Sequence, residues 1–259
     1  MKKNNLKTII VLGMHRSGTS TVAGILYKIG INMGQKMLGK THSNPLGHFE
    51  DKEFVDLNNR ILGTSGGNWD SPPSEKNIIA QKNKFEKEIR NLVSIKNKDN
   101  SKYWGWKDPR TSLTIQLYLP YLKNPCFIVC HRQAKAVTES LLQRDRIEIQ
   151  EGMKLWEIYE KRIDIFFKEF SKLKRLDLQY ENVIAEPEET VRKTIDFINL
   201  NITKERYENA VDFILPKKGI RKLSKKVRIV NLVNAGLKKP WIVPGYIFKK
   251  INVKVKNKN

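Results

Sequence analysis

The stretch "VLGMHRSGTSTVAGIL" (residues 11–26) decides the fold of this 259-residue chain. An apolar strand runs into Gly13, four residues separate Gly13 from Gly18, and an apolar helix opens at Thr19 and Ser20. This order of strand, glycine-bounded loop and helix is typical of a loop that wraps backbone N–H groups around an anion, next to the positive end of a helix dipole. The sequence therefore predicts a phosphate-binding loop at the first crossover.

One part of the usual nucleoside triphosphate-binding loop is missing. The lysine that bridges the outer phosphates normally stands between the second glycine and the hydroxyl residue, but here Thr19 follows Gly18 directly. The cation inside the loop is Arg16, whose planar guanidinium suits phosphate or sulfate oxygens. We therefore expect anion binding without triphosphate hydrolysis. The predicted binding residues are His15, Arg16, Ser17, Gly18, Thr19 and Ser20.

A second candidate anion site follows a later strand. In "IVCHRQAKAVTES" (residues 128–140), Arg132 ends a continuous apolar run, and Ser140 lies about two turns into the next helix. Ligands of open α/β sheets bind at the carboxyl ends of the strands, so Arg132 is expected at the same edge as Arg16. Ser140 would then present its hydroxyl beside Arg132.

Strand-like apolar runs alternate with stretches of helical periodicity along the chain. The run at residues 125–132 is typical of a strand buried on both faces of a parallel sheet. The alternation predicts an α/β fold with three layers, in which a central parallel sheet is flanked by helices. The expected strands are residues 6–12, 103–108, 125–132 and 174–183, and the expected helices are residues 18–29, 49–62, 75–95, 111–122, 134–144, 151–172 and 187–200.

Charge and composition suggest two parts and an anionic partner. Residues 1–216 are expected to form the α/β domain, and residues 217–259 a basic segment that packs on it or is partly flexible. The net charge is +22, from 49 Lys and Arg against 27 Asp and Glu. Such a charge favours an anionic acceptor, such as a polysaccharide or glycolipid, or peripheral docking on an anionic membrane, while a lysine-rich surface that is merely solvated would explain it equally well. Nucleic acid is not expected as a partner.

The two cysteines and the apolar runs bear on compartment and metal content. Cys126 and Cys130 lie on one face of one expected strand, where a disulfide between them is geometrically disfavoured, and no Cys/His cluster has metal-ligand spacing. The N-terminal apolar run is only about six residues long, too short for a signal sequence, and no window reaches the ~18 apolar residues of a membrane span. The sequence predicts reduced cysteines, no metal and a cytoplasmic location, which allows peripheral contact with the inner membrane face.

The loop "HRSGTS" (residues 15–20) together with "VCHRQAKAVTES" (residues 129–140) resembles the sulfotransferase superfamily that uses 3′-phosphoadenosine 5′-phosphosulfate (PAPS). More specifically, the chain resembles bacterial sulfotransferase-family proteins over about residues 8–200, where "NPLGHFED", "NWDSPP", "GWKDPRTS" and "YENVIAEPEETVRKTIDFINL" also match in order and spacing. Ala134 departs from the pattern, because the family usually has proline there. The family's cofactor-covering loop is not clearly recognisable in the C-terminal segment.

The resemblance implies an activity and a set of ligands. It implies transfer of a sulfuryl group from PAPS to an acceptor hydroxyl or amine by in-line displacement without a metal, leaving adenosine 3′,5′-bisphosphate (PAP). Residues 15–20 would hold the 5′-phosphosulfate, and Arg132 and Ser140 the 3′-phosphate. Carbohydrate hydroxyls are the acceptor class that the resemblance favours.

Four residues are candidates for catalysis. The resemblance implies an acceptor-activating Glu or His after the first helix, and Glu50 in "GHFED" matches the carboxylate, with His48 as the second candidate. Arg16 is expected to stabilise charge growing on the leaving phosphate. Lys107 follows a strand in "GWKDPR" and is expected to contact the sulfuryl oxygens.

Several neighbouring residues are predicted to be structural. Asp108 and Arg110 are expected to form an ion pair, and Tyr180 and Glu181 to brace the sheet. Tryptophans are more often core residues than ligand contacts, which is the expectation for Trp69, Trp104, Trp106 and Trp156.

Two other functions fit parts of the sequence. A kinase or other nucleotide phosphotransferase fits the loop, but it would bind ATP with magnesium, and the lysine-free loop disfavours it. A non-enzymatic basic protein that binds nucleic acid or membrane fits the charge and predicts steeply salt-dependent binding. That second reading leaves the ordered motifs unexplained.

Overall fold

The computed structural model describes residues 6–39, 47–98 and 102–214. The predicted basic segment, residues 217–259, lies outside these residues.

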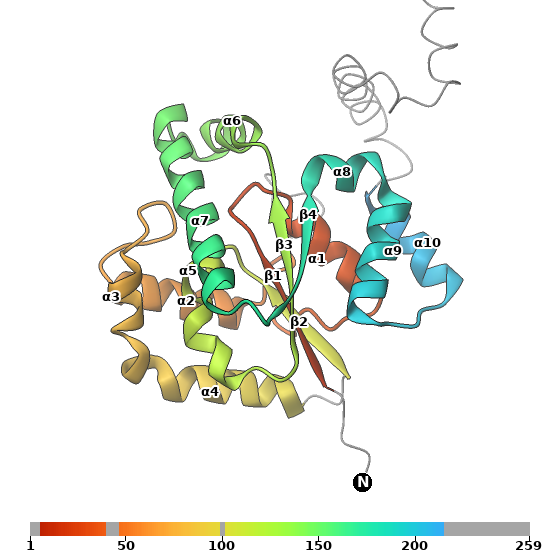
Figure 1. Ribbon diagram of the computed structural model, residues 1–259, viewed down its shortest axis with the longest axis horizontal. Helices are drawn as coiled ribbons and strands as arrows, with labels where there is room; N and C mark the ends of the chain where they lie inside the picture. Colours follow the sequence, from red (N-terminus) through yellow and green to blue (C-terminus); the bar gives the residue numbers. More distant parts are fainter. Residues whose placement is uncertain (1–5, 40–46, 99–101, 215–259) are drawn as a thin grey trace, which may run out of the picture.

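Parallel strands form a central sheet in the order β2–β1–β3–β4 (Figure 1). Residues Lys7 to Val11 of β1 pair with Tyr103 to Lys107, and on the other side Thr8 to Leu12 pair with Pro125 to Val129. All three pairings in the sheet are parallel, so every strand ends at the same edge. The strands are β1 (Lys7–Leu12), β2 (Tyr103–Lys107), β3 (Pro125–His131) and β4 (Lys174–Gln179).

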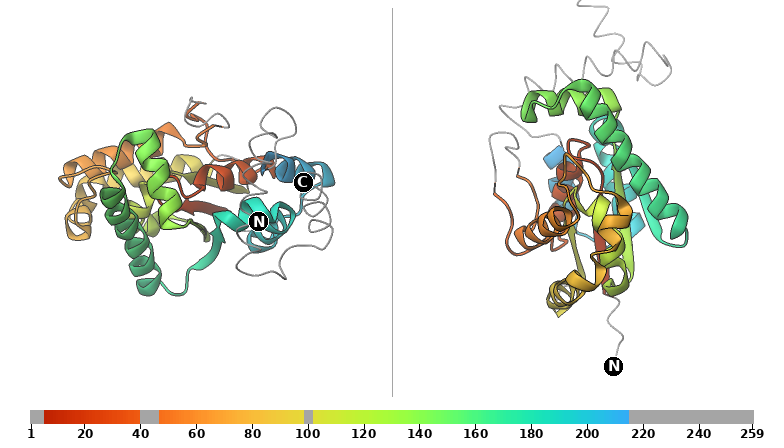
Figure 2. Two further views of the ribbon diagram at one scale, coloured as in Figure 1. Left: turned by 90° about the horizontal axis from the view of Figure 1, so that it is seen from above. Right: turned by 90° about the vertical axis from the view of Figure 1, so that its left-hand side faces the viewer.

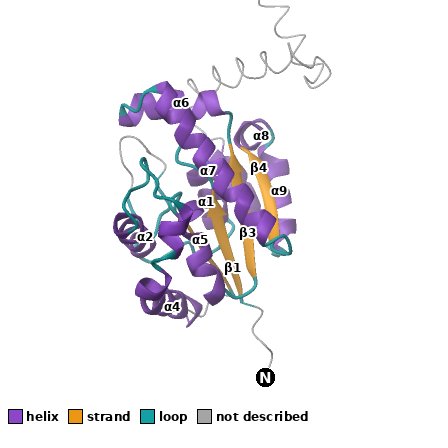
Figure 3. Cartoon of the chain, turned by 60° about the vertical axis from the view of Figure 1, so that its left-hand side comes forward, coloured by secondary structure: helices purple, strands orange, loops and turns teal. Residues whose placement is uncertain are grey.

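Helices cover both faces of the sheet, and α7 and α9 lie on opposite faces (Figure 3). One face is covered by α2 (Lys52–Thr64), α3 (Glu75–Ile79), α4 (Lys82–Lys98), α5 (Thr111–Tyr118), the short helix η1 (Leu119–Tyr121), α6 (Ala134–Asp145) and α7 (Ile149–Glu169). The other face is covered by α1 (Thr19–Lys28), α8 (Tyr180–Ala185), α9 (Pro187–Ile198) and α10 (Lys204–Ile214).

The central strand β1 separates two apolar cores. Its side chains alternate across the sheet, so Ile10 and Leu12 enter the core under α2, α5 and α7, while Ile9 and Val11 enter the core under α1 and α9. All four of these side chains are fully buried. The predicted α/β fold, with helices on both faces of a parallel sheet, is confirmed.

The structure corrects several predicted boundaries. The helix expected over residues 75–95 is broken into α3 and α4, which lets Ile78 and Phe85 both reach the core. The helix expected over residues 111–122 ends at Tyr118, because Pro120 has no N–H to continue the helical ladder and opens η1 instead.

Two further differences concern the site. The helix expected from residue 49 begins at Lys52, because the Asp51 side chain caps it by accepting from the Glu53 amide, which leaves Phe49 and Glu50 ahead of the helix. The strand expected over residues 174–183 ends at Gln179, and α8 begins at Tyr180. The helix α10 was not predicted.

None of the helices in the described part of the chain is long and apolar enough to cross a membrane.

Candidate active site

The predicted phosphate-binding loop joins β1 to α1 and has a tightly curled backbone. Gly13, Arg16 and Gly18 all have positive φ, at 137°, 70° and 92°. The Ser17 hydroxyl donates to the Met14 carbonyl at 2.6 Å, which closes the turn from inside. Arg16, Ser17 and Gly18, which are half of the predicted binding residues, therefore shape the curve of the loop.

Two glycines in this loop leave no room for a side chain. A Cβ on Gly13 would lie 2.6 Å from the Cys130 carbonyl oxygen, and one on Gly18 would lie 2.1 Å from the Tyr180 ring. The N-cap residue of α1 is Gly18, which has no side chain to cap the helix that begins at Thr19. The loop thus curls in front of the N-terminal end of α1, and this geometry suits an anion such as phosphate.

The second predicted anion site lies directly against the first. Arg16 Nε donates to Ser140 Oγ at 2.7 Å, and Arg132 Nη1 donates to the Arg16 carbonyl at 2.8 Å. Arg132 Nε is buried and has no hydrogen-bond partner among the described residues. Arg16, Arg132 and Ser140, which are far apart in the sequence, therefore form one continuous cationic wall.

Neighbouring cations act on Arg16 in this wall. Partial burial lowers the pKa of the Arg16 guanidinium, and the nearby Arg144 and Arg132 cations lower it further, while Asp145 opposes them. Arg144 is itself paired with Asp145, Nε to Oδ2 at 2.7 Å. Mutual repulsion among clustered arginines is relieved when a phosphate or sulfate binds between them.

The predicted base lies at the other end of the loop, beside Lys107. Lys107 Nζ donates to Glu50 Oε1 at 2.6 Å and to Ser20 Oγ at 3.1 Å. Lys107 is 1% exposed and Glu50 is 8% exposed, so the pair is almost dry. A single ammonium group therefore touches the carboxylate and the first turn of α1 at once.

His48, the second candidate base, is partly buried two residues before Glu50. Burial lowers the pKa of His48, and the Lys107, Arg144 and Arg16 cations lower it further, against the opposing effect of Glu50. Its imidazole is thus favoured in the neutral form, which can accept a proton.

His15 lies in an aromatic setting. Its ring packs against Trp69 at 4.3 Å and against Tyr159 at 6.2 Å between ring centroids. Burial, reinforced by Arg110 and other nearby cations, holds the pKa of His15 well below its usual range. Its Nε2 is buried without a hydrogen-bond partner among the described residues, and its role as a donor to the loop's ligand stays a prediction.

Four residues have the structural roles predicted for them: Asp108, Arg110, Trp104 and Trp106. Arg110 Nη1 pairs with Asp108 Oδ1 at 2.8 Å, as predicted, and Asn58 donates to the other oxygen of Asp108 at 2.8 Å. Trp104 and Trp106 are buried and stack on each other at 5.7 Å, in the predicted core role.

Tyr180 was expected to brace the sheet, but the structure places it in the site. Its ring lies against Gly18 and faces the Arg132 guanidinium at 4.7 Å. The cause is the early end of β4, which puts Tyr180 at the carboxyl edge rather than inside a strand. Its neighbour Glu181 accepts from the Gln133 amide at 3.3 Å, ahead of α6.

Sequence reasoning also missed an ion-pair network around His131. His131 Nδ1 lies 2.8 Å from Glu160 Oε2, and Nε2 lies 2.8 Å from Asp177 Oδ1. Both carboxylates raise the pKa of His131, to about 9. Because His131 immediately precedes Arg132, this network fixes the end of β3 where the arginine leaves the sheet. This network is hard to predict from the sequence, because His131, Glu160 and Asp177 lie on three separate elements, β3, α7 and β4.

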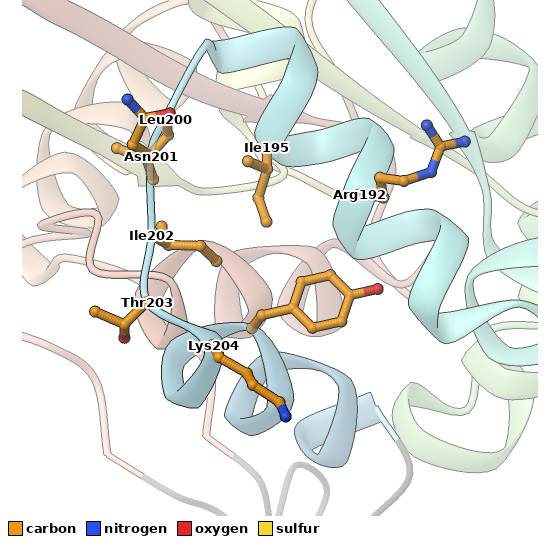
Figure 4. Close-up of a pocket in the computed structure, with 8 residues that line it drawn as sticks. Arg192, Ile195, Leu200, Asn201, Ile202, Thr203 and Lys204 are labelled. Atoms are coloured by element: carbon orange, nitrogen blue, oxygen red, sulfur yellow. The ribbon is translucent and has the colours of Figure 1, made fainter.

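A groove of about 380 Å³ lies elsewhere, between α9 and α10 (Figure 4). It is lined by Arg192, Ile195, Leu200, Asn201, Ile202, Thr203, Lys204 and Tyr207. None of the predicted site residues lines it.

Comparison with protein families identifies the class of protein. The sequence model described as "Sulfotransferase family" matches residues 8–204, so the chain belongs to the sulfotransferase family. The family resemblance predicted from the motifs is confirmed, and the protein is an enzyme that transfers sulfuryl groups. The kinase and non-enzymatic alternatives are thereby set aside. A search of curated proteins found no match.

Solved structures with the same fold are distant in sequence. The sulfotransferase domain from the Synechococcus PCC 7002 olefin synthase is 14% identical, with a TM-score of 0.53, covering 82% of this chain and 83% of that one. The sulfotransferase domain from the curacin biosynthetic pathway is 16% identical, with a TM-score of 0.49 and coverage of 78% and 76%. A sulfotransferase from Mycobacterium tuberculosis H37Rv is 13% identical, with a TM-score of 0.49 and coverage of 79% and 70%.

The His131 network predicts a pH dependence of stability. The pKa of His131 is about 9 in the folded protein against 6.5 for the ordinary side chain. Protonated His131 therefore stabilises the folded state fully below pH 6.5. This stabilisation is lost as the pH rises through 9, and the free energy of unfolding falls by no more than about 1.4 kcal/mol per pH unit. Urea unfolding of wild type and His131→Gln between pH 6 and pH 9.5 measures it. We expect the difference between the two proteins to shrink with rising pH, and a constant difference would contradict the assignment.

Proposed function

We propose that the enzyme takes its sulfuryl group from PAPS and transfers it to an acceptor hydroxyl, with Glu50 as the base. One observation carries the proposal. The anion cradle meets the arginine wall through Arg16 on one side and the buried Glu50–Lys107 pair through Ser20 on the other. The residues proposed to bind the two phosphates and the residue proposed to accept the proton are therefore linked by successive contacts.

The residues present fit the donor. A Cβ at Gly13 or Gly18 would clash with Cys130 or Tyr180, so the tight path of the loop requires glycine at both positions, and Arg132 Nε is a buried donor without a partner among the described residues. The loop from His15 to Ser20 would hold the 5′-phosphosulfate, and Arg132 and Ser140 the 3′-phosphate. When bound, PAPS would supply the sulfuryl group, and PAP would be left as the second product.

Glu50 is suited to take the proton of the acceptor hydroxyl. Its Oε1 accepts a hydrogen bond from Lys107 Nζ at 2.6 Å, which fixes the orientation of the carboxylate. Lys107 also reaches Ser20 at the start of α1, so its ammonium is placed to stabilise negative charge between the loop and the base. His48 is the second candidate for the base, since its lowered pKa favours the neutral imidazole.

Arg16 is suited to stabilise the leaving phosphate. Its guanidinium is part of the wall, and its own backbone at φ 70° forms the bend of the loop. Charge growing on the phosphate would meet this cation and the positive end of the α1 dipole.

We propose a carbohydrate hydroxyl, on a glycan or glycolipid, as the acceptor. Support comes from the net charge of +22 and from the resemblance to bacterial members of the family. We also propose a cytoplasmic location with peripheral contact at the inner membrane face, because a lysine-rich protein binds anionic surfaces.

Removing the proposed base tests its role. We expect Glu50→Gln to lower kcat about 10²- to 10⁴-fold, the usual contribution of general base catalysis, with PAP affinity unchanged in titration calorimetry. Glu88→Gln is the matched control, since Glu88 pairs with Arg60 on the exposed faces of α4 and α2. Near-normal turnover by a folded Glu50→Gln protein would rule out this base and favour His48.

The 3′-phosphate site has its own test. We expect Arg132→Ala to weaken PAP binding about 10- to 150-fold, the worth of a hydrogen bond to a charged group, and to leave adenosine 5′-phosphate binding nearly unchanged. Titration calorimetry with the two nucleotides measures the difference. Arg175→Ala is the control, because Arg175 lies in β4 and pairs with Asp177. Equal losses for both nucleotides would contradict the assignment of Arg132 to the 3′-phosphate.

A further inference from the structure

Phe49, which stands between the two candidate bases His48 and Glu50, has an unfavourable backbone conformation. Its φ is 52°, in the left-handed region that glycine and asparagine adopt readily and bulky residues avoid. Such strain persists only where the surrounding structure holds it, and it is concentrated at functional sites. A glycine would fit this turn without strain, so the presence of phenylalanine indicates that its ring is needed.

The ring of Phe49 is held between two helices. The Tyr27 ring from α1 lies 5.8 Å from it, and the Phe213 ring from α10 lies 5.6 Å from it, edge to face at 87°. Edge-to-face pairs at this separation are favourable beyond the area they bury. Residues from three distant parts of the sequence therefore meet at Phe49.

The contact comes from α10, which lies side by side with α1 (Figure 2). A Cβ on Gly24 of α1 would lie 2.1 Å from the Phe213 ring, so the missing side chain of Gly24 is what admits the ring. The Phe213 ring thus packs against α1 at Gly24 and contacts the Phe49 ring at the same time.

The chain after Phe49 is fixed by polar contacts. The Glu50 carbonyl accepts from the Leu38 amide at 2.7 Å, and the Lys52 amide donates to the Lys36 carbonyl at 2.8 Å. Asp51 accepts from the buried Lys96 ammonium at 2.7 Å. The backbone of this stretch is therefore held by polar contacts after Phe49 and by the ring contacts of Phe49 with Tyr27 and Phe213.

We propose that Phe213 and Phe49 form an aromatic wedge that positions Glu50 and His48 on the same side of the catalytic site. Both are positioning residues, acting through the backbone of the "GHFED" stretch (residues 47–51). The proposal rests on the proposed role of Glu50 as the base. It gives α10 a part in catalysis, although this helix contributes none of the predicted site residues.

The test compares Phe213→Leu with Phe197→Leu. Phe197 is the matched control, because it is a phenylalanine of α9 that is partly buried against the same core. Three quantities are measured for each variant: hydrogen exchange of the Leu38 amide, which reports on its bond to Glu50, then kcat, and the KM for PAPS. Phe213→Tyr, which keeps the ring, is the rescue variant.

We expect Phe213→Leu to speed exchange of the Leu38 amide and to lower kcat about 10- to 100-fold, the effect of a misplaced catalytic group, with the KM for PAPS unchanged. Phe213→Tyr should restore kcat, and Phe197→Leu should lower thermal stability without either change. Phe49→Gly should also lower kcat, although it removes the backbone strain.

Three results would overturn the wedge: unchanged Leu38 exchange in Phe213→Leu, faster exchange with normal kcat, or equal losses of kcat in Phe197→Leu. Leu38 exchange is measured without donor or acceptor. If Glu50→Gln remains active, the proposed base is wrong, whereas the exchange result still shows whether Phe213 holds this stretch.

Discussion

The contact between Lys107 and Glu50 links the two halves of the site. The ammonium of Lys107 is 1% exposed and bridges the carboxylate to Ser20 at the start of α1. Neither charge could be buried alone at this depth, because an unpaired charge in a protein interior costs several kcal/mol. The end of β2, the start of α1 and the chain ahead of α2 are therefore tied to one another. The same pairing holds the Glu50 side chain in a nearly dry position.

The topology of the sheet brings the remaining groups to this pair. Since all strands run in parallel, the loop after β1, Lys107 at the end of β2 and Arg132 after β3 meet at one edge. The central place of β1 puts the anion cradle between the base and the arginine wall. Ligand binding at the carboxyl edge of such a sheet is the general rule for open α/β folds. In this protein the order of the strands also sets the order of the chemical groups.

Much of the fold could be predicted from the sequence, because apolar runs and helical periodicity are local signals. The grouping of Arg16, Arg132 and Ser140 was also predictable, since strand ends in a parallel sheet share an edge. Tyr180 was misplaced because the end of β4 has no strong breaker. The partners of His131 and of Phe49 could not be foreseen, because the packing of α7 on β3 and of α10 on α1 brings them together only in the folded chain.

The central claim is that sulfuryl transfer from PAPS, and not phosphoryl transfer from ATP, is the reaction of this site. It is tested most directly in one mixture of the enzyme with extracted surface glycans, PAPS labelled on sulfur, and ATP labelled on its γ-phosphate with magnesium. The measurement is the label recovered in the glycan fraction. We predict that the sulfur label enters the glycans and that the phosphate label does not. Phosphate label in the glycans, with the sulfur label left in PAPS, would contradict the claim.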